Sequence, residues 1–201
     1  MEAGNLALKY DQKYTYTNYA SWNDDTRWEL IDGVPYAMSA PSLVHQEVLL
    51  NLSAQFSIKL RGRLCRPFIA PVDVRLNFNK GDDTVVQPDM IVVCDQHKLV
   101  NGKSCLGAPD LVVEVISPAS TKMDKLLKFK KYLHAGVKEY WILDPIANIV
   151  EAYILKNGEY VVNSYSAADT ITVSAFADCE ITLADVFIPE EPQETQEADH
   201  A

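Results

Sequence analysis

Two acidic residues lie within apolar, strand-like runs of the sequence. Asp89 is in the run 85–94, next to Pro88, and Glu114 is in the run 111–116. A carboxylate in such a place has to be paired, hydrogen-bonded or bound to a metal, because burying it alone costs several kcal/mol. Two such acids on neighbouring strands would repel each other unless a cation lies between them. Carboxylate oxygens suit Mg²⁺, and water bound to Mg²⁺ is a suitable nucleophile at phosphorus, so the pair points to phosphodiester hydrolysis.

A purely structural explanation exists for each acid taken alone. Glu114 would pair with a lysine of the following helix, and Asp89 would cap or hydrogen-bond a local turn beside Pro88. Alternation along the strand places Gln87 on the same face as Asp89. The presence of two such acids favours the metal site over the structural explanation.

Turn signals and helix caps indicate the elements that would carry these acids. The dipeptide Asp32-Gly33 between two apolar-rich runs predicts a β-hairpin over 27–38. Ser42 as an N-cap, followed by apolar residues at helical spacing, predicts a helix over 43–61 that ends at Gly62.

A second helix is expected over 121–135. Its apolar stripe would consist of Leu126, Phe129 and Leu133, and Gly136 would be the left-handed residue beyond its end. The remaining apolar runs predict strands over 67–78, 85–94, 111–116 and 139–143, a hairpin that pairs 149–155 with 160–165, and a strand with a short turn within 171–188.

The predicted order β-β-α-β-β-β-α-β-β-β indicates an α/β fold of the mixed α+β type. Helices would flank a mixed central β-sheet, with an N-terminal β-hairpin and an additional C-terminal hairpin. A length of 201 residues suits one domain. We expect an N-terminal arm over 1–26, a folded domain over 27–188 and an acidic, disordered tail over 189–201.

The formal charge of −10 argues against nonspecific coating of nucleic acid. The segment 189–201 holds five acids and no lysine or arginine, and the rest of the chain has 23 acids against 18 bases. The basic residues gather in two groups, Lys122, Lys125, Lys128, Lys130, Lys131 and Lys138, and Arg61, Arg63 and Arg66. These groups form either a local basic surface or the solvated face of an amphipathic helix.

The four cysteines, at positions 65, 94, 105 and 179, show no Cys-x-x-Cys spacing and no zinc-site histidine close by. We expect all four to be reduced and structural, with Cys94 at a half-buried strand end. No apolar run approaches the roughly 20 residues of a membrane span, and the N-terminus has no secretory signal. We therefore expect no transmembrane segment and a cytoplasmic location.

The order of several short motifs resembles a known family. Gln87-Pro88-Asp89, followed by Val113-Glu114-Val115-Ile116, resembles the bipartite core of the PD-(D/E)XK nucleases, the restriction-endonuclease-like superfamily. Over residues 27–165 the chain is most similar to a bacterial family described as putative restriction endonucleases. The motifs that carry this similarity are Glu29 to Gly33, Ser42 with His45-Gln46, Gln87 to Met90, Glu114 to Pro118, and Asp124, Lys128 and Tyr132 before Gly136 to Pro145.

The resemblance implies a restriction-endonuclease-like core and a metal site. Asp89 and Glu114 would hold Mg²⁺ or Mn²⁺, and the main-chain carbonyl of Val115 would be a third protein ligand. The superfamily pattern has a lysine where this chain has Ile116. A lysine from the next helix would therefore orient the attacking water.

The family spacing selects Lys128 for this role, because Asp124, Lys128 and Tyr132 are four residues apart on one side of a helix. Periodicity alone does not choose Lys128 over Lys125.

Three further residues are implied in the site. Gln87 would position water or substrate, Glu29 would be an additional acid near the metal, and His45 would form a wall of the site. Read without the resemblance, Glu29 is a hairpin-edge carboxylate and His45 a hydrogen-bonded core histidine.

The predicted function is that of a metal-dependent endonuclease acting on DNA. A homodimer would bring two basic helices to one cleft, with the hairpin at 149–165 as the interface. The main alternative is a noncatalytic nucleic-acid-binding or assembly module that keeps the nuclease fold. A weaker alternative is a carboxylate-pair glycosidase, for which the sequence lacks a sugar-binding signature.

Overall fold

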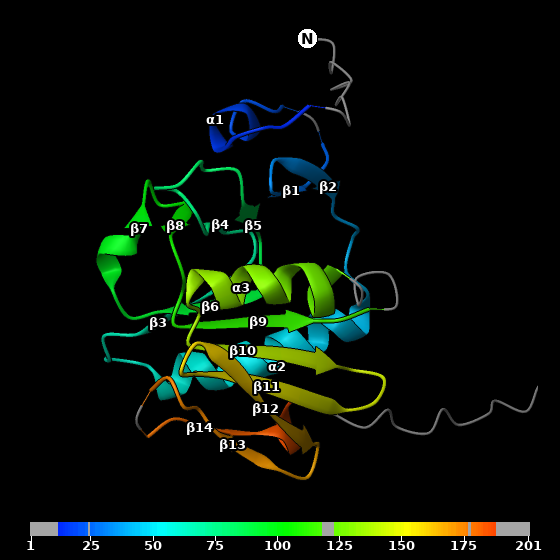
Figure 1. Ribbon diagram of the computed structural model, residues 1–201. Helices are drawn as coiled ribbons and strands as arrows, with labels where there is room; N and C mark the ends of the chain where they lie inside the picture. Colours follow the sequence, from blue (N-terminus) through cyan, green and yellow to red (C-terminus); the bar gives the residue numbers. More distant parts are fainter. Residues whose placement is uncertain (1–11, 24, 118–122, 177, 188–201) are drawn as a thin grey trace, which may run out of the picture.

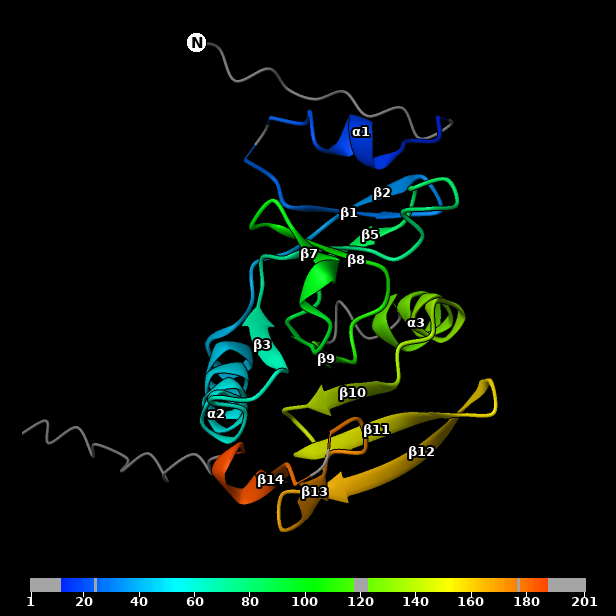
Figure 2. The ribbon, with the colours of Figure 1, turned by 90° about the vertical axis from the view of Figure 1, so that its left-hand side faces the viewer.

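The computed structural model of the chain describes residues 12–23, 25–117, 123–176 and 178–187 (Figures 1 and 2). Two six-stranded mixed sheets and a short two-stranded sheet account for its strands. We call the first the upper sheet and the second the central sheet, from their places in Figure 1. None of the helices in these residues is long and apolar enough to cross a membrane.

The upper sheet has the strand order β2-β1-β5-β4-β8-β7. Its strands are β1 (Trp28–Ile31), β2 (Val34–Ala37), β4 (Asp73–Arg75), β5 (Val85–Val86), β7 (Leu99–Val100) and β8 (Ser104–Leu106). The central sheet has the order β12-β11-β10-β9-β6-β3. Its strands are β3 (Arg66–Ile69), β6 (Met90–Val93), β9 (Leu111–Val115), β10 (Glu139–Asp144), β11 (Ile149–Lys156) and β12 (Glu159–Ser166).

Short elements complete the fold. The third sheet pairs β13 (Thr170–Thr172) with β14 (Glu180–Thr182). The helical segments are α1 (Tyr16–Tyr19), α2 (Leu43–Lys59), a π-helical segment η2 (Met123–Lys128) that continues into α3 (Phe129–Ala135), and the 3₁₀ turns η1 (Gln96–Lys98) and η3 (Leu183–Asp185).

Helices α2 and α3 cover opposite faces of the central sheet (Figure 2). On one face Val113 packs in a core cluster with Leu52 and Phe56 of α2. On the other face Val112 packs in a cluster with Tyr132 of α3. Because both faces are covered, β9 is a nearly continuous apolar run, and Glu114 faces the same side as Val112.

Both predicted hairpins are confirmed. Asp32 and Gly33 have φ of 51° and 77°, and Asn157 and Gly158 have φ of 53° and 86°. Two successive positive φ angles are the requirement of a tight turn whose twist matches the strands it joins. The first turn connects β1 to β2, and the second connects β11 to β12.

The expectation of a single central sheet is wrong, because two predicted strands are each divided between sheets. The run 67–78 forms β3 and β4, which are separated by the cis peptide Ala70–Pro71. The run 85–94 forms β5 and β6, with Pro88 between them. Proline has no N–H to donate to a strand neighbour, so each ladder stops there and the chain passes to the other sheet. The pair β7 and β8 was not predicted.

The two predicted helices are present with different details. Ser42 caps α2 by accepting a hydrogen bond from the His45 amide at 3.2 Å, and the helix ends at Lys59. Gly136 has the expected left-handed conformation after α3, with φ of 83°. The predicted stripe is wrong at Leu126, which is 54% exposed, because the π-helical turn rotates the side chains away from the 3.6-residue period.

The prediction that all four cysteines are reduced is wrong for two of them. Cys65 and Cys94 form a disulfide. They flank the register pair Arg66 and Val93 of the antiparallel strands β3 and β6, so strand pairing makes them neighbours across 29 residues of sequence. Cys105 and Cys179 are free and buried.

The segment before β1 packs on the upper sheet. The Tyr14 amide donates to the Gly33 carbonyl at 2.9 Å, and the Tyr16 amide donates to the Asp82 carbonyl at 2.7 Å. The predicted tail over 189–201 and Lys122 of the first basic group lie outside the described residues.

Candidate active site

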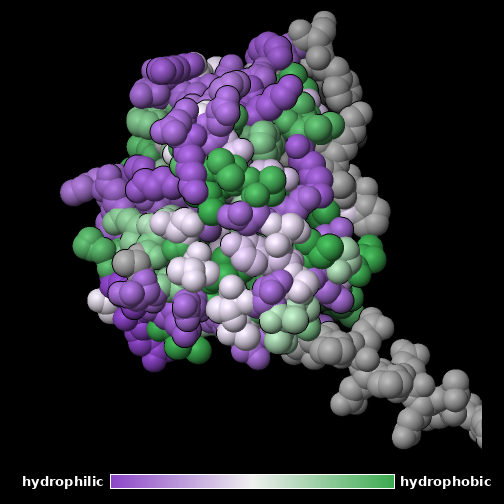
Figure 3. Space-filling view, turned by 60° about the horizontal axis from the view of Figure 1, so that its bottom comes forward, coloured by the Kyte–Doolittle hydropathy of each residue, from purple (hydrophilic) through white to green (hydrophobic). Residues whose placement is uncertain are grey.

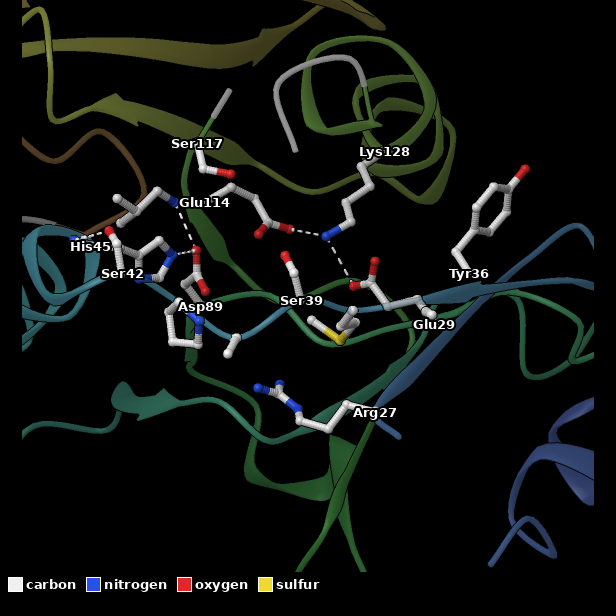
Figure 4. A pocket seen from close by; sticks show the side chains of 15 residues that line it. Arg27, Glu29, Tyr36, Ser39, Ser42, His45, Asp89, Glu114, Ser117 and Lys128 are labelled. Atoms are coloured by element: carbon white, nitrogen blue, oxygen red, sulfur yellow. Dashed lines mark hydrogen bonds and ion pairs between the residues drawn. The ribbon is translucent and has the colours of Figure 1, made fainter. Parts of the chain in front are cut away.

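A pocket of about 360 Å³ lies where the two large sheets meet (Figure 4). Its acidic residues come from separate elements, with Glu29 on β1, Asp89 just before β6 and Glu114 on β9. The residues that line it are Arg27, Glu29, Tyr36, Ala37, Met38, Ser39, Ala40, Pro41, Ser42, His45, Asp89, Glu114, Val115, Ser117 and Lys128.

Asp89 is fixed by two donors on one side of the pocket. Its Oδ2 accepts from Nε2 of His45 at 3.0 Å and from the amide of Val115 at 2.8 Å. The Asp89 carbonyl also accepts from the amide of Ala70. These contacts hold the carboxylate in the short segment between β5 and β6, and 18% of the Asp89 side chain is exposed.

A buried lysine lies between two buried carboxylates on the other side. Nζ of Lys128 is 3.1 Å from Oε1 of Glu114 and 2.9 Å from Oε1 of Glu29. All three residues are less than 5% exposed. An ion group this deeply buried requires each charge to keep its partner, because one unpaired member would be costly. The pairing of Glu114 with a lysine from the following helix is also what the structural explanation of this acid predicts.

Tyr132 contacts the same carboxylate as Lys128. Its hydroxyl donates to Oε1 of Glu114 at 2.7 Å. Burial, and then the charge of Glu114, raises the pKa of Tyr132 well above its usual value. The phenol therefore stays protonated and serves as a permanent hydrogen-bond donor to Glu114.

The structure brings Lys128 into the pocket and not Lys125. Nζ of Lys125 lies 2.8 Å from Oε2 of Glu151 on β11, and both side chains are partly exposed. Lys128 and Tyr132 project to the same side of the helix and meet at Glu114, as their four-residue spacing requires. The Asp124 side chain lies outside the described part of the chain.

The Gln87 side chain points out of this pocket, and the expectation that it shares a face with Asp89 is wrong. Oε1 of Gln87 accepts from Nε and Nη2 of Arg27, and Nε2 donates to Tyr19 and Asp73. Only the main chain of Gln87 serves the pocket, since its amide donates to Oε1 of Glu29 at 2.8 Å. The cause is the break at Pro88, which ends the regular alternation of side chains.

The sequence did not indicate that Arg27 and the segment 36–42 line the pocket. Arg27 is two residues from Glu29, so β-strand alternation could have placed both on one side. Tyr36 is the register partner of Glu29 in the hairpin, and it lines the pocket for that reason. The serines of the segment carry no comparable signal.

Much of the first basic group is neutralised by neighbouring acids. Lys131 contacts Asp32 at 2.6 Å, and Lys138 contacts Asp110 at 2.7 Å. The second group follows the C-terminus of α2, about 25 Å along the helix axis from the end that carries His45. These observations favour solvated, paired lysines over a broad basic surface.

The sequence matches the family Uma2, described as "Putative restriction endonuclease", over residues 14–184. The chain belongs to this family. The resemblance inferred from the motifs is thereby confirmed.

Two further proteins are similar to this Uma2 chain. An uncharacterized protein of Synechocystis sp. is 27% identical over 167 residues, which is 81% of this chain and 86% of that protein. The crystal structure of a protein from Anabaena variabilis, described as a putative nuclease of DUF820, superposes with a TM-score of 0.70 at 16% identity. The match covers 87% of this chain and 97% of the Anabaena chain, and it shows that the two proteins share a fold.

The donor set of the Uma2 pocket fits a hard divalent ion. No group of three or more His, Cys, Asp or Glu side chains placed to hold a metal occurs among the described residues. Two carboxylates, of Asp89 and Glu114, nevertheless line one pocket together with Val115, the residue after Glu114. Both hydrogen bonds that the described residues donate to the Asp89 carboxylate end on Oδ2, so Oδ1 can accept a ligand. Few protein oxygens with water completing the shell are typical of Mg²⁺.

Proposed function

We propose that this protein is a metal-dependent endonuclease that hydrolyses phosphodiester bonds of DNA. The observation that carries the proposal is the convergence of Asp89, Glu114 and Lys128 on one pocket in a chain of the Uma2 family. These residues come from three segments of the chain, just before β6, on β9 and at the end of η2. Their meeting beside a solvent-filled space is consistent with a reaction site.

Asp89 and Glu114 would hold Mg²⁺ or Mn²⁺, with the Val115 carbonyl as a third protein ligand. The ion, when bound, would supply charge stabilisation at the phosphate and would lower the pKa of water for the attack. His45 and the Val115 amide keep Asp89 in position through its Oδ2. Positioning of this kind is important because metal ligands depend on the groups that orient them.

Lys128 would orient the attacking water and offset the charge that grows on the phosphoryl oxygens. Its ammonium is held between Glu29 and Glu114, and Tyr132 holds Glu114 in turn. A donor fixed before the reaction stabilises developing charge without having to reorganise. Glu29 is therefore a positioning residue for Lys128. The Gln87 amide supports Glu29 rather than contacting substrate.

We further propose that the protein forms a homodimer through the β11–β12 hairpin. Strand β12 is the edge of the central sheet, and it exposes Val161 and Val162 by 45% and 51%. Figure 3 brings this end of the molecule forward and shows hydrophobic side chains between polar ones on the visible face. An exposed apolar edge strand is suited to pairing with another chain. Light scattering should give twice the chain mass for the wild type and the chain mass for Val162→Lys, and a monomeric wild type would contradict the dimer.

A noncatalytic nucleic-acid-binding module is the second candidate. It is favoured by one observation, the pairing of Lys128 with both Glu29 and Glu114, which gives these charges a structural role. In that case the pocket would bind no divalent ion.

Calorimetric titration with Mn²⁺, beside cleavage assays on plasmid and single-stranded DNA, separates the two candidates. The wild type should bind Mn²⁺ and cleave, and Asp89→Ala should do neither. Asp185→Ala is a matched control, because Asp185 is an exposed acid on η3 outside the pocket. Absence of Mn²⁺ binding by the wild type would reject the nuclease. Cleavage that persists unchanged in Asp89→Ala would remove Asp89 from the reaction.

A further inference from the structure

A second pocket, of about 490 Å³, shares Arg27 with the candidate active site. We call it the aromatic pocket. Arg27 lines both pockets, and Figure 4 shows it at the edge of the candidate active site away from Glu114 and Lys128. The lining residues are Tyr16, Tyr19, Ala20, Trp22, Thr26, Arg27, Trp28, Asp73, Gln87, Asn101, Lys103 and Ser104.

Four aromatic side chains form a connected wall of this pocket. Tyr16 and Tyr19 are stacked with centroids 5.9 Å apart, Tyr19 and Trp22 are 5.4 Å apart, and Trp22 and Trp28 are 6.0 Å apart. All four are only partly buried, but the Arg75 guanidinium already lies over the Tyr16 ring, 3.9 Å from its centroid, so Tyr16 supports the wall rather than contacting a base. Aromatic side chains that stay partly exposed in a pocket offer flat π faces, which are the surfaces that stack on nucleobases of any sequence.

The polar side of the pocket presents a carboxylate with one oxygen already used. Oδ1 of Asp73 accepts from the Tyr19 hydroxyl and from Nε2 of Gln87, each at 2.9 Å. Burial, and then the charge of Asp73, raises the pKa of Tyr19, so this phenol remains a donor. Oδ2 of Asp73 receives no hydrogen bond from the residues that the structure describes, which leaves it to accept an N–H from a ligand. The amino group of cytosine is a donor that carboxylates accept.

The wall between the two pockets is made of residues that serve both. The Gln87 side chain binds Arg27 and Asp73 in the aromatic pocket, while its amide binds Glu29 in the candidate active site. A DNA strand bound in the candidate active site would therefore reach the aromatic pocket past Arg27, which lines both pockets. Lys103 lies among the lining residues and supplies a positive charge for a phosphate.

We infer that the aromatic pocket binds an unpaired nucleobase of the DNA strand, stacked on the aromatic wall with an amino-bearing edge on Asp73. The inference rests on the proposed nuclease function and names its substrate class, which is single-stranded or locally unpaired DNA. A base within an intact duplex cannot enter such a pocket, because its faces and pairing edge are already occupied.

The test measures binding of fluorescein-labelled single-stranded dC12 and dT12 by fluorescence anisotropy, in EDTA so that no cleavage occurs. The wild type should bind dC12 more tightly than dT12 and more tightly than a duplex of the same length. Asp73→Asn should weaken dC12 binding roughly 10-fold and abolish the preference for dC12. The control Asp185→Asn, which changes charge equally on a distant surface, should bind as the wild type does.

A second variant addresses the aromatic wall without relying on Asp73. Trp22→Ala should lower affinity for dC12 and dT12 alike, because stacking does not depend on base identity. Its fold is checked by thermal unfolding, and Phe78→Ala is the control for loss of a partly exposed aromatic outside both pockets. Equal binding of dC12 and dT12 by the wild type, or full affinity in Trp22→Ala, would overturn the inference.

Two outcomes distinguish failure of this inference from failure of the proposed nuclease function. Quenching of tryptophan fluorescence by dCMP in EDTA, lost in Asp73→Asn, would support the aromatic pocket even if Mn²⁺ elicited no cleavage. Normal Mn²⁺-dependent cleavage with an unchanged KM for single-stranded DNA in Asp73→Asn would reject the pocket and leave the nuclease standing.

Discussion

Two buried glutamates on adjacent strands of the central sheet differ in what surrounds them. Glu114 on β9 and Glu139 on β10 are 3% and 1% exposed. Glu114 lies at a pocket beside Lys128 and a second carboxylate. Glu139 lies on the opposite face of the sheet, where Oε1 accepts from Nε1 of Trp141 at 2.7 Å and Oε2 accepts from the Ala175 amide at 2.8 Å.

The two acids also lie at opposite ends of their strands. Glu114 is near the carboxyl end of β9, and Glu139 begins β10, so that their register partners are Ile142 and Leu111. In open sheets, ligands bind outside the carboxyl ends of the strands. A buried acid in an apolar strand therefore does not by itself indicate a reaction site. A cation, a second acid and a pocket at the carboxyl end distinguish the functional candidate.

The largest expected difference is in catalysis when each glutamate is changed to glutamine. Glu114→Gln should lower the rate of Mn²⁺-dependent DNA cleavage by at least roughly 1,000-fold, because it removes a metal ligand and a partner of Lys128. Glu139→Gln should leave the rate within about threefold, because only structural donors contact this side chain. Single-turnover cleavage of both variants measures the contrast. Equal losses would mean that Glu114 acts through folding alone.

The lysine contrast is expected to be somewhat smaller. Lys128→Met keeps the aliphatic stem and should lower the rate about 100-fold, because it removes a fixed positive charge near the phosphate. It should also destabilise the metal-free protein by about 3–5 kcal/mol, since Glu29 and Glu114 lose their shared cation. Mn²⁺ binding should persist in calorimetry and restore part of the melting temperature.

Lys125→Met is the matched control for this variant. Lys125 is three residues away and pairs with Glu151 at the surface, so both rate and stability should stay near the wild type. If Lys125→Met lost cleavage activity and Lys128→Met kept it, Lys125 would be the lysine that acts in the reaction.

Tyr132→Phe removes a single hydrogen bond from Glu114 and should have a moderate effect. We expect about a 10-fold loss of Mn²⁺ affinity or rate, as is typical when a group that orients a metal ligand is removed. Tyr140→Phe is the comparison, because Tyr140 packs against Tyr132 in the same core cluster. A Tyr132→Phe protein with unchanged metal affinity and rate would show that Lys128 alone fixes Glu114.

Local sequence signals predicted most of the elements but not how they combine. The turns at Asp32-Gly33 and Asn157-Gly158 were predictable because positive φ angles select few residue types. The division of 85–94 between two sheets was not, because Pro88 indicates a break and says nothing about which strands each half joins. The disulfide between Cys65 and Cys94 likewise depends on the pairing of β3 with β6.

The candidate site was predicted to the extent that its residues interrupt a regular pattern. Asp89 and Glu114 were visible as acids in apolar runs, and both line the pocket. Lys128 needed the family motif, because helical periodicity alone does not choose it over Lys125. Glu139 was overlooked as a buried acid because it begins a strand directly after the turn at Gly136, where an acid is unremarkable in sequence. Its burial is created by the C-terminal segment that folds over it at Ala175.

The smallest expected effect is on stability, and it concerns Glu139. Burial raises its pKa, an effect that the hydrogen bonds from Trp141 and Ala175 only partly offset. The folded protein therefore binds this proton more tightly than the unfolded chain, and the free energy of unfolding should fall as pH rises from about 4.5 through the folded-state pKa. Glutamine does not titrate, so the stability of the wild type relative to Glu139→Gln should decline across this window in urea unfolding. The contribution of Asp169 to stability depends on pH in the opposite direction, because hydrogen bonds from Ser166 lower the pKa of Asp169. This contribution is lost only as the pH falls below the usual aspartate pKa of 3.8. A wild-type curve that runs parallel to the Glu139→Gln curve would show that Trp141 and Ala175 compensate the buried charge fully, and the contrast between the two glutamates would then rest on Lys128 and the pocket alone.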